Sequence, residues 1–388
     1  MDRTGTVPRI AVIDVARFYA MALVYYGHFI EEFMNLKNPV AATQYKFIYS
    51  FHMVLFIVLA GYVAKEQDAD LKLDQFLRSR FYSRFLPFLF FTGLMMIPPV
   101  FVEGKFFGLV LPSVEGYTKG VVATLFGLPY FCVPSWFLLL VMGVEIVHYS
   151  AFRFMKQSPA RMLLLGLLFY LAGYWFNRTV EIFNPLAGRI VGWNYFFIHE
   201  AVTLYAFYLM GLYLRRKQVF IKKVPVAFPV LGGGAAFLIL LFTYRLNTGP
   251  FNFNYYDSVV IMMASHGHVW LFPLTAIAGS AFILFLAQMT PTQKAFAWMG
   301  ENTLILMCLN GIFYHYINPG LAGWVLKTFS GSASVITTSG IITTIASLLL
   351  CMPLVFVLNT YVPQLVGKPK TNGPLLPSLV PPSGHRAG

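Results

Sequence analysis

Two ionisable residues, Arg17 and His28, lie eleven positions apart inside the first long apolar stretch, IAVIDVARFYAMALVYYGHFI (residues 10–30). Eleven residues of α-helix make three turns plus about 20°, so both side chains point the same way, about 16 Å apart along the axis. Ionisable groups within a membrane span are costly and mark functional sites by default. The spacing predicts a helix face with a cationic anchor near the membrane surface and a titratable base near the middle. The alternative is an Arg17 that only extends to the surface, with an incidental histidine.

The chemistry of this face follows from its residue types. A neutral imidazole can take a proton from a hydroxyl that arrives from outside, and a guanidinium suits a phosphate or carboxylate on a donor from inside. Asp14 precedes Arg17 by three residues and can pair with it, either at the site or as a surface ion pair. Glu32 could orient the His28 ring, but we favour the interpretation that Glu31 and Glu32 mark the outer helix end in water.

A second cationic set lies in RSRFYSRFLP (residues 78–87). Arg80 and Arg84 are four residues apart and therefore share a helix face. Guanidiniums at one membrane mouth can bind the nucleotide phosphates of coenzyme A. Ordinary anchoring of a helix end on the cytoplasmic side explains the same residues equally well.

Three further patches carry polar or aromatic residues in apolar surroundings. His52 lies in SFHMVLFIVLAGY, Trp136 in PSWFLLLV, and Glu301 and Asn302 in GENT. Each has a plain structural interpretation as well: Trp136 fits an interfacial aromatic belt, and Asn302 fits a helix cap.

Metal and disulfide chemistry find little support. The three cysteines lie in apolar stretches without C-x-x-C spacing. His266 and His268 form an H-x-H pair for which the sequence offers no third ligand. We therefore expect no metal.

Composition limits the class of protein. Of the 388 residues, 58% are hydrophobic and 11% charged, and 39 are Phe. A soluble chain of this composition would aggregate, so the sequence predicts an all-α polytopic protein in a lipid bilayer, with about ten transmembrane helices around a polar pore. The net charge is +13, but the chain offers no soluble basic face that could bind nucleic acid. The excess of Lys and Arg instead reflects membrane topology, because these residues accumulate in loops that face the cytoplasm.

Apolar runs long enough to span the membrane occur near residues 10–33, 44–64, 83–102, 133–150, 162–177, 196–214, 226–244, 269–288, 302–318 and 336–359. With an inside N-terminus, 19 of the 28 basic residues fall in inside segments and 8 outside. This bias predicts that both termini are cytoplasmic. We expect the protein in the cell inner membrane. We expect one transmembrane domain over residues 1–363 and a disordered, Pro- and Gly-rich cytoplasmic tail over 364–388.

Taken in order, these patches resemble the acyltransferase 3 family of integral membrane O-acyltransferases. The pattern D-x-x-R-x10-H of Asp14, Arg17 and His28 resembles the family's first-span signature. Five further segments resemble its later motifs: FHMVLFIVLAGY, RFYSRFLP, SWFLLLV, FYLMGLYLRR and MGENTLILMCLN. The similarity runs from about residue 9 to 360. The layout and the GKP start of the tail are closest to the branch of glucans biosynthesis protein C.

The resemblance implies acyl transfer, acetyl or succinyl, from cytoplasmic acyl-CoA to a hydroxyl of an extracytoplasmic glycan. It implies His28 as catalytic base beside Arg17 and Asp14, with Arg17, Arg80 and Arg84 at the donor. We expect the remaining patches to contact substrate, namely His52, Trp136, Glu301 and Asn302. Three positions depart from the family pattern: Ala60 replaces Ser, Asn310 replaces His, and Arg80 stands one residue further from Arg84 than usual.

Two other classes of function stay open. The first is a transporter or flippase for a glycan or lipid, in which Arg17 and His28 line a permeation path. Its usual mark, an inverted repeat, is not found in the sequence. The second is a sensory or scaffolding membrane protein whose polar residues only hold helices together.

Overall fold

The computed structural model describes residues 10–106, 113–156, 158–179, 195–220, 224–249, 257–291 and 293–380. Within these ranges every regular element is a helix, apart from one isolated bridge between Val260 and Ser265. The prediction of an all-α membrane protein is confirmed.

The α-helices are α1 Ala11–Asn35, α2 Pro39–Tyr49, α3 His52–Val63, α4 Leu73–Arg80, α5 Leu86–Met95, α6 Val114–Leu125, α7 Trp136–Ala151, α8 Pro159–Thr179, α9 Ile198–Arg216, α10 Ala227–Leu246, α11 Leu271–Met289, α12 Lys294–Glu301, α13 Thr303–Ile312, α14 Asn318–Thr328 and α15 Ala333–Tyr361. Two π-helical segments are η2 Phe81–Phe85 and η8 Phe313–Ile317. The short 3₁₀ turns are η1 Glu66–Asp70, η3 Pro98–Val100, η4 Val133–Ser135, η5 Phe152–Phe154, η6 Tyr195–Phe197, η7 Ile261–Met263 and η9 Pro363–Val366.

Eight helical segments among the described residues are long and apolar enough to cross a bilayer, and they match eight of the ten predicted spans: Pro39–Val63, Leu73–Val100, Val133–Phe154, Pro159–Thr179, Tyr195–Arg216, Ala227–Leu246, Leu271–Met289 and Ala333–Tyr361. The first predicted span is α1, whose 25 residues include several ionisable side chains. The ninth is divided between α13 and η8 and continues into α14.

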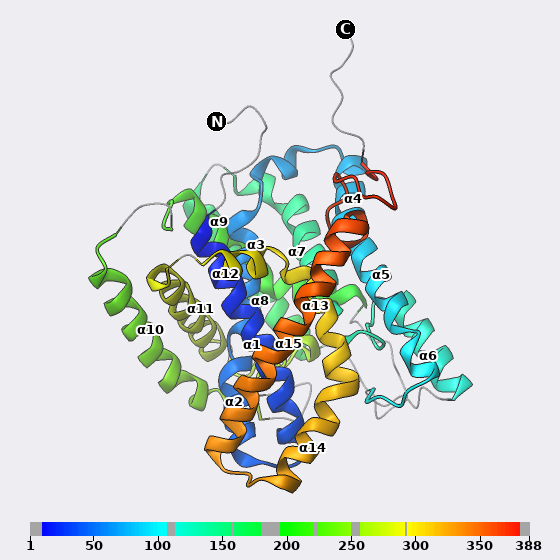
Figure 1. The fold of residues 1–388 in the computed structure, drawn as a ribbon. Helices are drawn as coiled ribbons and strands as arrows, with labels where there is room; N and C mark the ends of the chain where they lie inside the picture. The colour runs from blue at the N-terminus through cyan, green and yellow to red at the C-terminus, as the bar shows by residue number, and fades with distance from the viewer. Residues whose placement is uncertain are drawn as a thin grey trace.

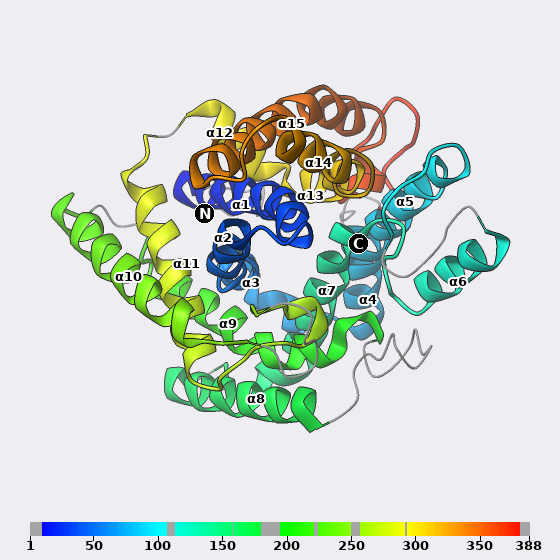
Figure 2. The same cartoon turned by 90° about the horizontal axis from the view of Figure 1, so that it is seen from below.

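The helices form two layers around the bundle axis. Figure 2 shows α1, α2 and α3 inside a ring that includes α8, α10, α15 and α5. Burial agrees, because 72% of the most apolar window in α2–α3 is buried, against 28% in α8 and in α15. The start of α1 and the segment after α15 lie at the same end of the bundle (Figure 1). The helix that carries Arg17 and His28 therefore belongs to the protein interior.

Helices α3 and α9 pack with their backbones in close approach. A Cβ added to Gly61 would lie 2.0 Å from the Tyr208 carbonyl oxygen, and one added to Gly211 would lie 2.0 Å from the carbonyl oxygen of Val58. Small residues at such crossings are typical of membrane helices, which gain stability from tight packing rather than from the hydrophobic effect. This contact fixes α3, and with it His52, against the bundle.

We expect Gly61→Ala to destabilise the protein by about 1–3 kcal/mol, because the added methyl group must push two backbones apart. The measurement is the unfolding midpoint of the purified protein in detergent. Gly93→Ala and Gly234→Ala are matched controls, since nothing lies within 4 Å of an added Cβ at either position. A midpoint for Gly61→Ala that equals those of the controls would contradict this reading of the α3–α9 contact.

The segment predicted to be a disordered tail differs from that expectation where the structure describes it. Gln364 and Val366, both within the predicted tail, are buried against the bundle. Gln364 Nε2 donates hydrogen bonds to the carbonyl oxygens of Thr371 and Leu376 at 2.8 and 2.5 Å. Buried anchors therefore hold this Pro- and Gly-rich stretch in place. Residues 381–388 lie outside the described residues.

Candidate functional site

A cavity of about 60 Å³, here called the outer cavity after the topology predicted from the sequence, brings together three of the predicted residues. His28 of α1, His52 of α3 and Trp136 of α7 all line it. The remaining lining residues come from α1, α2, α3, η4, the 260–263 turn and η8, namely Glu31, Tyr45, Tyr49, Met53, Val133, Val260, Ile261, Met262, Met263 and Tyr314. Two imidazoles from different helices therefore face one cavity.

The His28 ring is held by α13. Its Nδ1 lies 2.5 Å from the Asn310 amide oxygen. With the Asn310 amide in this orientation its oxygen can only accept, so Nδ1 carries the proton and Nε2 keeps its lone pair. Asn310, which departs from the family pattern, thus selects the tautomer in which Nε2 is the basic nitrogen.

Glu31 joins the two imidazoles through two tyrosines. Its carboxylate accepts hydrogen bonds from the hydroxyls of Tyr314 and Tyr49, each at 3.2 Å. The Tyr314 ring packs edge-on against His28 with centroids 4.9 Å apart, and Tyr49 packs in the same way against His52 at 4.7 Å. We favoured Glu31 as a helix end in water, and this interpretation is wrong: only 4% of the residue is exposed.

Glu32 also differs from both interpretations considered for it. The residue is 4% exposed, so it does not mark a helix end in water. Its carboxylate accepts hydrogen bonds from Lys105 Nζ at 2.6 and 2.9 Å, rather than from His28. The Lys105 carbonyl oxygen lies 2.8 Å from His315 Nδ1. The ion pair therefore ties the loop after η3 to α1, and this backbone contact ties it to η8.

A second cavity of about 240 Å³, here called the inner cavity after the same predicted topology, is lined by three cationic residues. Arg17 of α1, Arg84 of η2 and Glu301 of α12 line it, together with Lys368 from the segment after η9. The apolar part of the wall is formed mainly by α1, α3, α7 and α13, namely Met21, Phe56, Ala60, Phe137, Leu138, Val141, Leu304 and Met307. Thr303, Val366 and Gly367 complete it. Predicted residues from three separate motifs therefore meet here.

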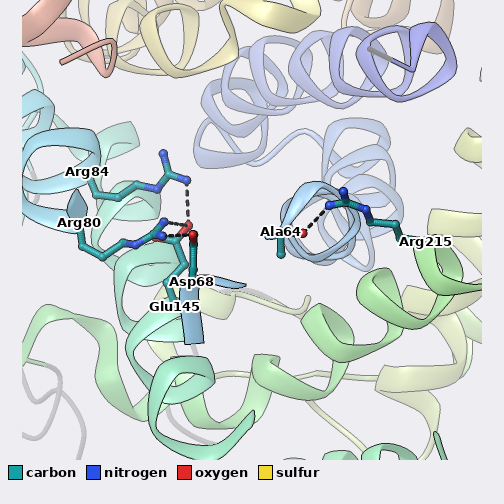
Figure 3. Close-up of polar contacts among 6 residues, drawn as sticks. All are labelled: Ala64, Asp68, Arg80, Arg84, Glu145 and Arg215. Carbon is teal, nitrogen blue, oxygen red and sulfur yellow. Dashed lines mark hydrogen bonds and ion pairs between the residues drawn. The ribbon is translucent and has the colours of Figure 1, made fainter. Parts of the chain in front are cut away.

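Arg80 and Arg84 converge on one buried carboxylate (Figure 3). Glu145 Oε1 lies 3.1 Å from Arg80 Nη1 and 2.9 Å from Arg84 Nη2. Arg80 forms a second ion pair with Asp68 and lies over the Phe76 ring. Arg84 lines the inner cavity, whereas Arg80 does not. Arg80, which stands one residue further from Arg84 than in the family pattern, therefore supports the Glu145 cluster from outside this cavity.

Two further cations at this end of the bundle, Arg215 and Arg216, hold the framework together. Arg215 donates to the Ala64 carbonyl oxygen, well apart from the Arg84 cluster (Figure 3). Arg216 donates to Glu66 at 2.7 and 2.8 Å. These charge-assisted hydrogen bonds lower the pKa of the Glu66 carboxyl below its usual value. Both contacts tie α9 to the turn after α3.

The two remaining predicted residues lie behind the cavity walls. Asp14 is 5% exposed, and its Oδ1 lies 3.4 Å from Arg17 Nη1, so the expected pair is present. Asn302 precedes α13 as predicted, but its side chain makes no capping hydrogen bond there. Instead it donates to the Trp298 carbonyl oxygen at 2.8 Å and accepts from Asn359 at 2.8 Å.

A wall of side chains separates the two cavities, which share no lining residue. Met53 of α3 and Trp136 of α7 face the outer cavity. Phe56, about one turn after Met53, and Phe137, directly after Trp136, face the inner cavity. The Phe56 and Phe137 rings lie 5.5 Å apart between centroids. We call this pair the aromatic septum.

Sequence reasoning missed several residues of both cavities. Asn310 was noted only as a departure, and Lys368 only as part of a motif. Tyr49 and Tyr314 carry no distinguishing sequence signal. The two π-helical segments were missed as well, although they contain Arg84 and Tyr314. Single-turn π segments inside helices are frequent at functional sites, because the extra residue redirects a side chain.

Comparison with known families decides the class of protein. The model of the acyltransferase domain of the acyltransferase 3 family matches residues 10–359. The chain belongs to the acyltransferase 3 family. It is a multi-pass membrane acyltransferase. Neither a comparison with curated proteins nor one with solved structures gave a significant match. The assignment to the branch of glucans biosynthesis protein C stays a prediction.

Proposed function

We propose that this acyltransferase moves a short acyl group, acetyl or succinyl, from cytoplasmic acyl-CoA to a hydroxyl of an extracytoplasmic glycan. His28 acts as the catalytic base, and Arg17 and Arg84 bind the donor. One observation carries the proposal: a single buried helix presents an imidazole to the outer cavity and a guanidinium to the inner one. The protein would lie in the inner membrane with both termini in the cytoplasm.

The donor enters the inner cavity with its phosphates toward Arg17 and Arg84. About 16 Å of helix α1 separate Arg17 from His28, so the extended arm that carries the thioester must pass the aromatic septum. The apolar walls exclude water from the thioester, and holding both substrates supplies orientation. The transporter interpretation loses its support, because the family is one of acyltransferases.

The chemical step uses the basic nitrogen of His28. Nε2 takes the proton of the acceptor hydroxyl as that oxygen attacks the thioester carbonyl carbon. The carbon–sulfur bond then breaks, and the proton passes from the imidazole to the departing thiolate. The products are an ester and free CoA. A transient acyl-imidazole formed on the same nitrogen gives the same products in two steps.

The outer cavity suits the edge of a sugar. His52, Glu31 and the two tyrosines offer several polar groups in one small space. Its volume of about 60 Å³ lies well below the roughly 300 Å³ of ordinary ligand pockets, so only the reacting hydroxyl and its neighbours fit as the cavity stands. The 260–263 turn supplies four lining residues, and we expect it to set the choice of acceptor.

The proposal is tested by giving membrane vesicles that contain the protein an acyl-CoA labelled in its acyl group. Mass spectrometry of glycans from cells with and without the gene then identifies the acceptor. We expect a single mass increment, which identifies the acyl group and its carrier together. The proposal would be overturned if the label stayed in acyl-CoA whichever glycan fraction was added.

Arg84→Gln is expected to raise the KM for acyl-CoA about tenfold, because one charge-assisted phosphate contact is lost. The KM for the acceptor should stay within a factor of two or so of wild type. Arg78→Gln is a matched control, since this neighbouring arginine lies outside the inner cavity. Equal increases in both KM values would assign Arg84 to folding rather than to donor binding.

A further inference from the structure

The segment after α15 forms part of the wall of the inner cavity. Val366, Gly367 and Lys368 line it beside Arg17 and Arg84. We propose that Lys368 binds a phosphate of the donor's nucleotide, which makes the C-terminal segment part of the donor site. This inference rests on the proposed function and adds to it a binding residue that lies outside every predicted membrane span.

The backbone of this segment is built to present the lysine. Gly367 has φ of +90°, a left-handed conformation that residues with a Cβ rarely adopt. The chain therefore reverses at Gly367, and the Lys368 amide donates back to the Pro363 carbonyl oxygen at 3.0 Å. Buried Gln364 holds the following turn through its two backbone hydrogen bonds. Lys368 thus stands on a fixed turn rather than on a free tail.

Two amides aim the ammonium group. Lys368 Nζ donates to Asn359 Oδ1 at 2.6 Å and to Asn302 Oδ1 at 3.3 Å. The amides are themselves linked, because Asn359 Nδ2 donates to Asn302 Oδ1 at 2.8 Å. Both acceptors are neutral amide oxygens, so these two hydrogen bonds orient the ammonium group without themselves placing a negative charge beside it. Asn302, expected to contact substrate, acts here as a positioning residue for Lys368.

Cations from three separate elements reach the cavity. Arg17, Arg84 and Lys368 line its wall with one acid, Glu301, while Asp14 and Glu145 pair with the two arginines from behind the wall. Lysine binds phosphate as a point charge, whereas arginine adds a planar fork. A nucleotide with a diphosphate and a further phosphate presents several anions at once, and cations on separate elements can each contact a different one.

The test compares three probes on the purified full-length protein: CoA, dephospho-CoA and pantetheine. We expect Lys368→Gln to weaken CoA binding about tenfold and to leave pantetheine binding unchanged. Loss of the wild-type difference between CoA and dephospho-CoA would assign the contact to the 3′-phosphate. Equal weakening of these two nucleotides would assign it to the diphosphate. Lys368→Arg, which keeps the charge, should restore most of the affinity.

Lys370→Gln is the matched control, because this lysine lies two residues further along and outside the cavity wall. Comparing probes on the same variant cancels any loss of folded protein. Unchanged CoA binding by Lys368→Gln, or equal weakening of CoA and pantetheine, would overturn the inference alone, provided that the wild type binds CoA and transfers its acyl group. A wild type that does neither would overturn the proposed function together with the inference.

Discussion

The His28→Ala variant is expected to lose acyl transfer by about 10²–10⁴-fold in kcat, the usual contribution of a general base. The loss should appear in kcat rather than in the KM for acyl-CoA, because the proposed function places the donor's phosphates in the other cavity. The measurement is initial-rate kinetics with acyl-CoA and acceptor in proteoliposomes, at matched amounts of inserted protein.

A second variant separates chemistry from packing. His28→Gln retains an amide that can donate to Asn310 but has no basic nitrogen, so we expect it to be as inactive as His28→Ala. His268→Gln is the control, because His268 is exposed and lines neither cavity. Turnover by His28→Ala within tenfold of wild type would end the assignment of His28 as base.

Glu145→Gln is expected to have the largest effect on stability, about 3–5 kcal/mol, because it leaves two partly buried guanidiniums without their shared carboxylate. Only 8% of the Glu145 side chain is exposed, and 12% and 27% of those of Arg80 and Arg84. Asp68 still compensates Arg80 in part. The change in stability is measured by heating the protein in detergent and recording the loss of monodisperse protein.

The double variant Glu145→Gln/Arg84→Gln supplies the control. Removing one guanidinium together with the carboxylate should recover part of the lost stability, so the two changes should be non-additive. Strict additivity would mean that Glu145 and Arg84 do not interact. Glu145→Gln with wild-type stability would mean that water already screens the cluster.

Hydropathy and helical geometry predicted the framework well, for physical reasons. A run of about 20 apolar residues has few alternatives to a membrane helix, so eight of the predicted spans recur in the structure. The shared face of Arg17 and His28 follows from the helical repeat alone. Hydropathy does not report breaks, however. The division between α2 and α3 at Ser50 and Phe51 and the π-helical segments lie inside stretches that read as continuous.

The contacts of the site could not be predicted in the same way. His28 meets Asn310 across 282 positions, and Glu31 meets Tyr314 across 283. Such pairs depend on which helices become neighbours in the bundle. The spacing and hydropathy of a single sequence do not indicate those neighbours. Local spacing suggested Glu32 as a partner of His28, but the nearby cation Lys105 forms the stronger, charge-assisted contact with that carboxylate.

The position of the aromatic septum bears on how the membrane potential would act on acyl transfer. The two cavities have separate lining residues, with Phe56 and Phe137 on the inner side of the division between them. On the proposed function the acyl group crosses this division, and with it the part of the membrane voltage that falls there. Moving one charge through the whole voltage changes its energy by about 2.3 kcal/mol per 100 mV. Export of an acetyl group would then be electrically silent. Export of a succinyl group, which carries a carboxylate outward from a negative interior, would draw on the membrane potential.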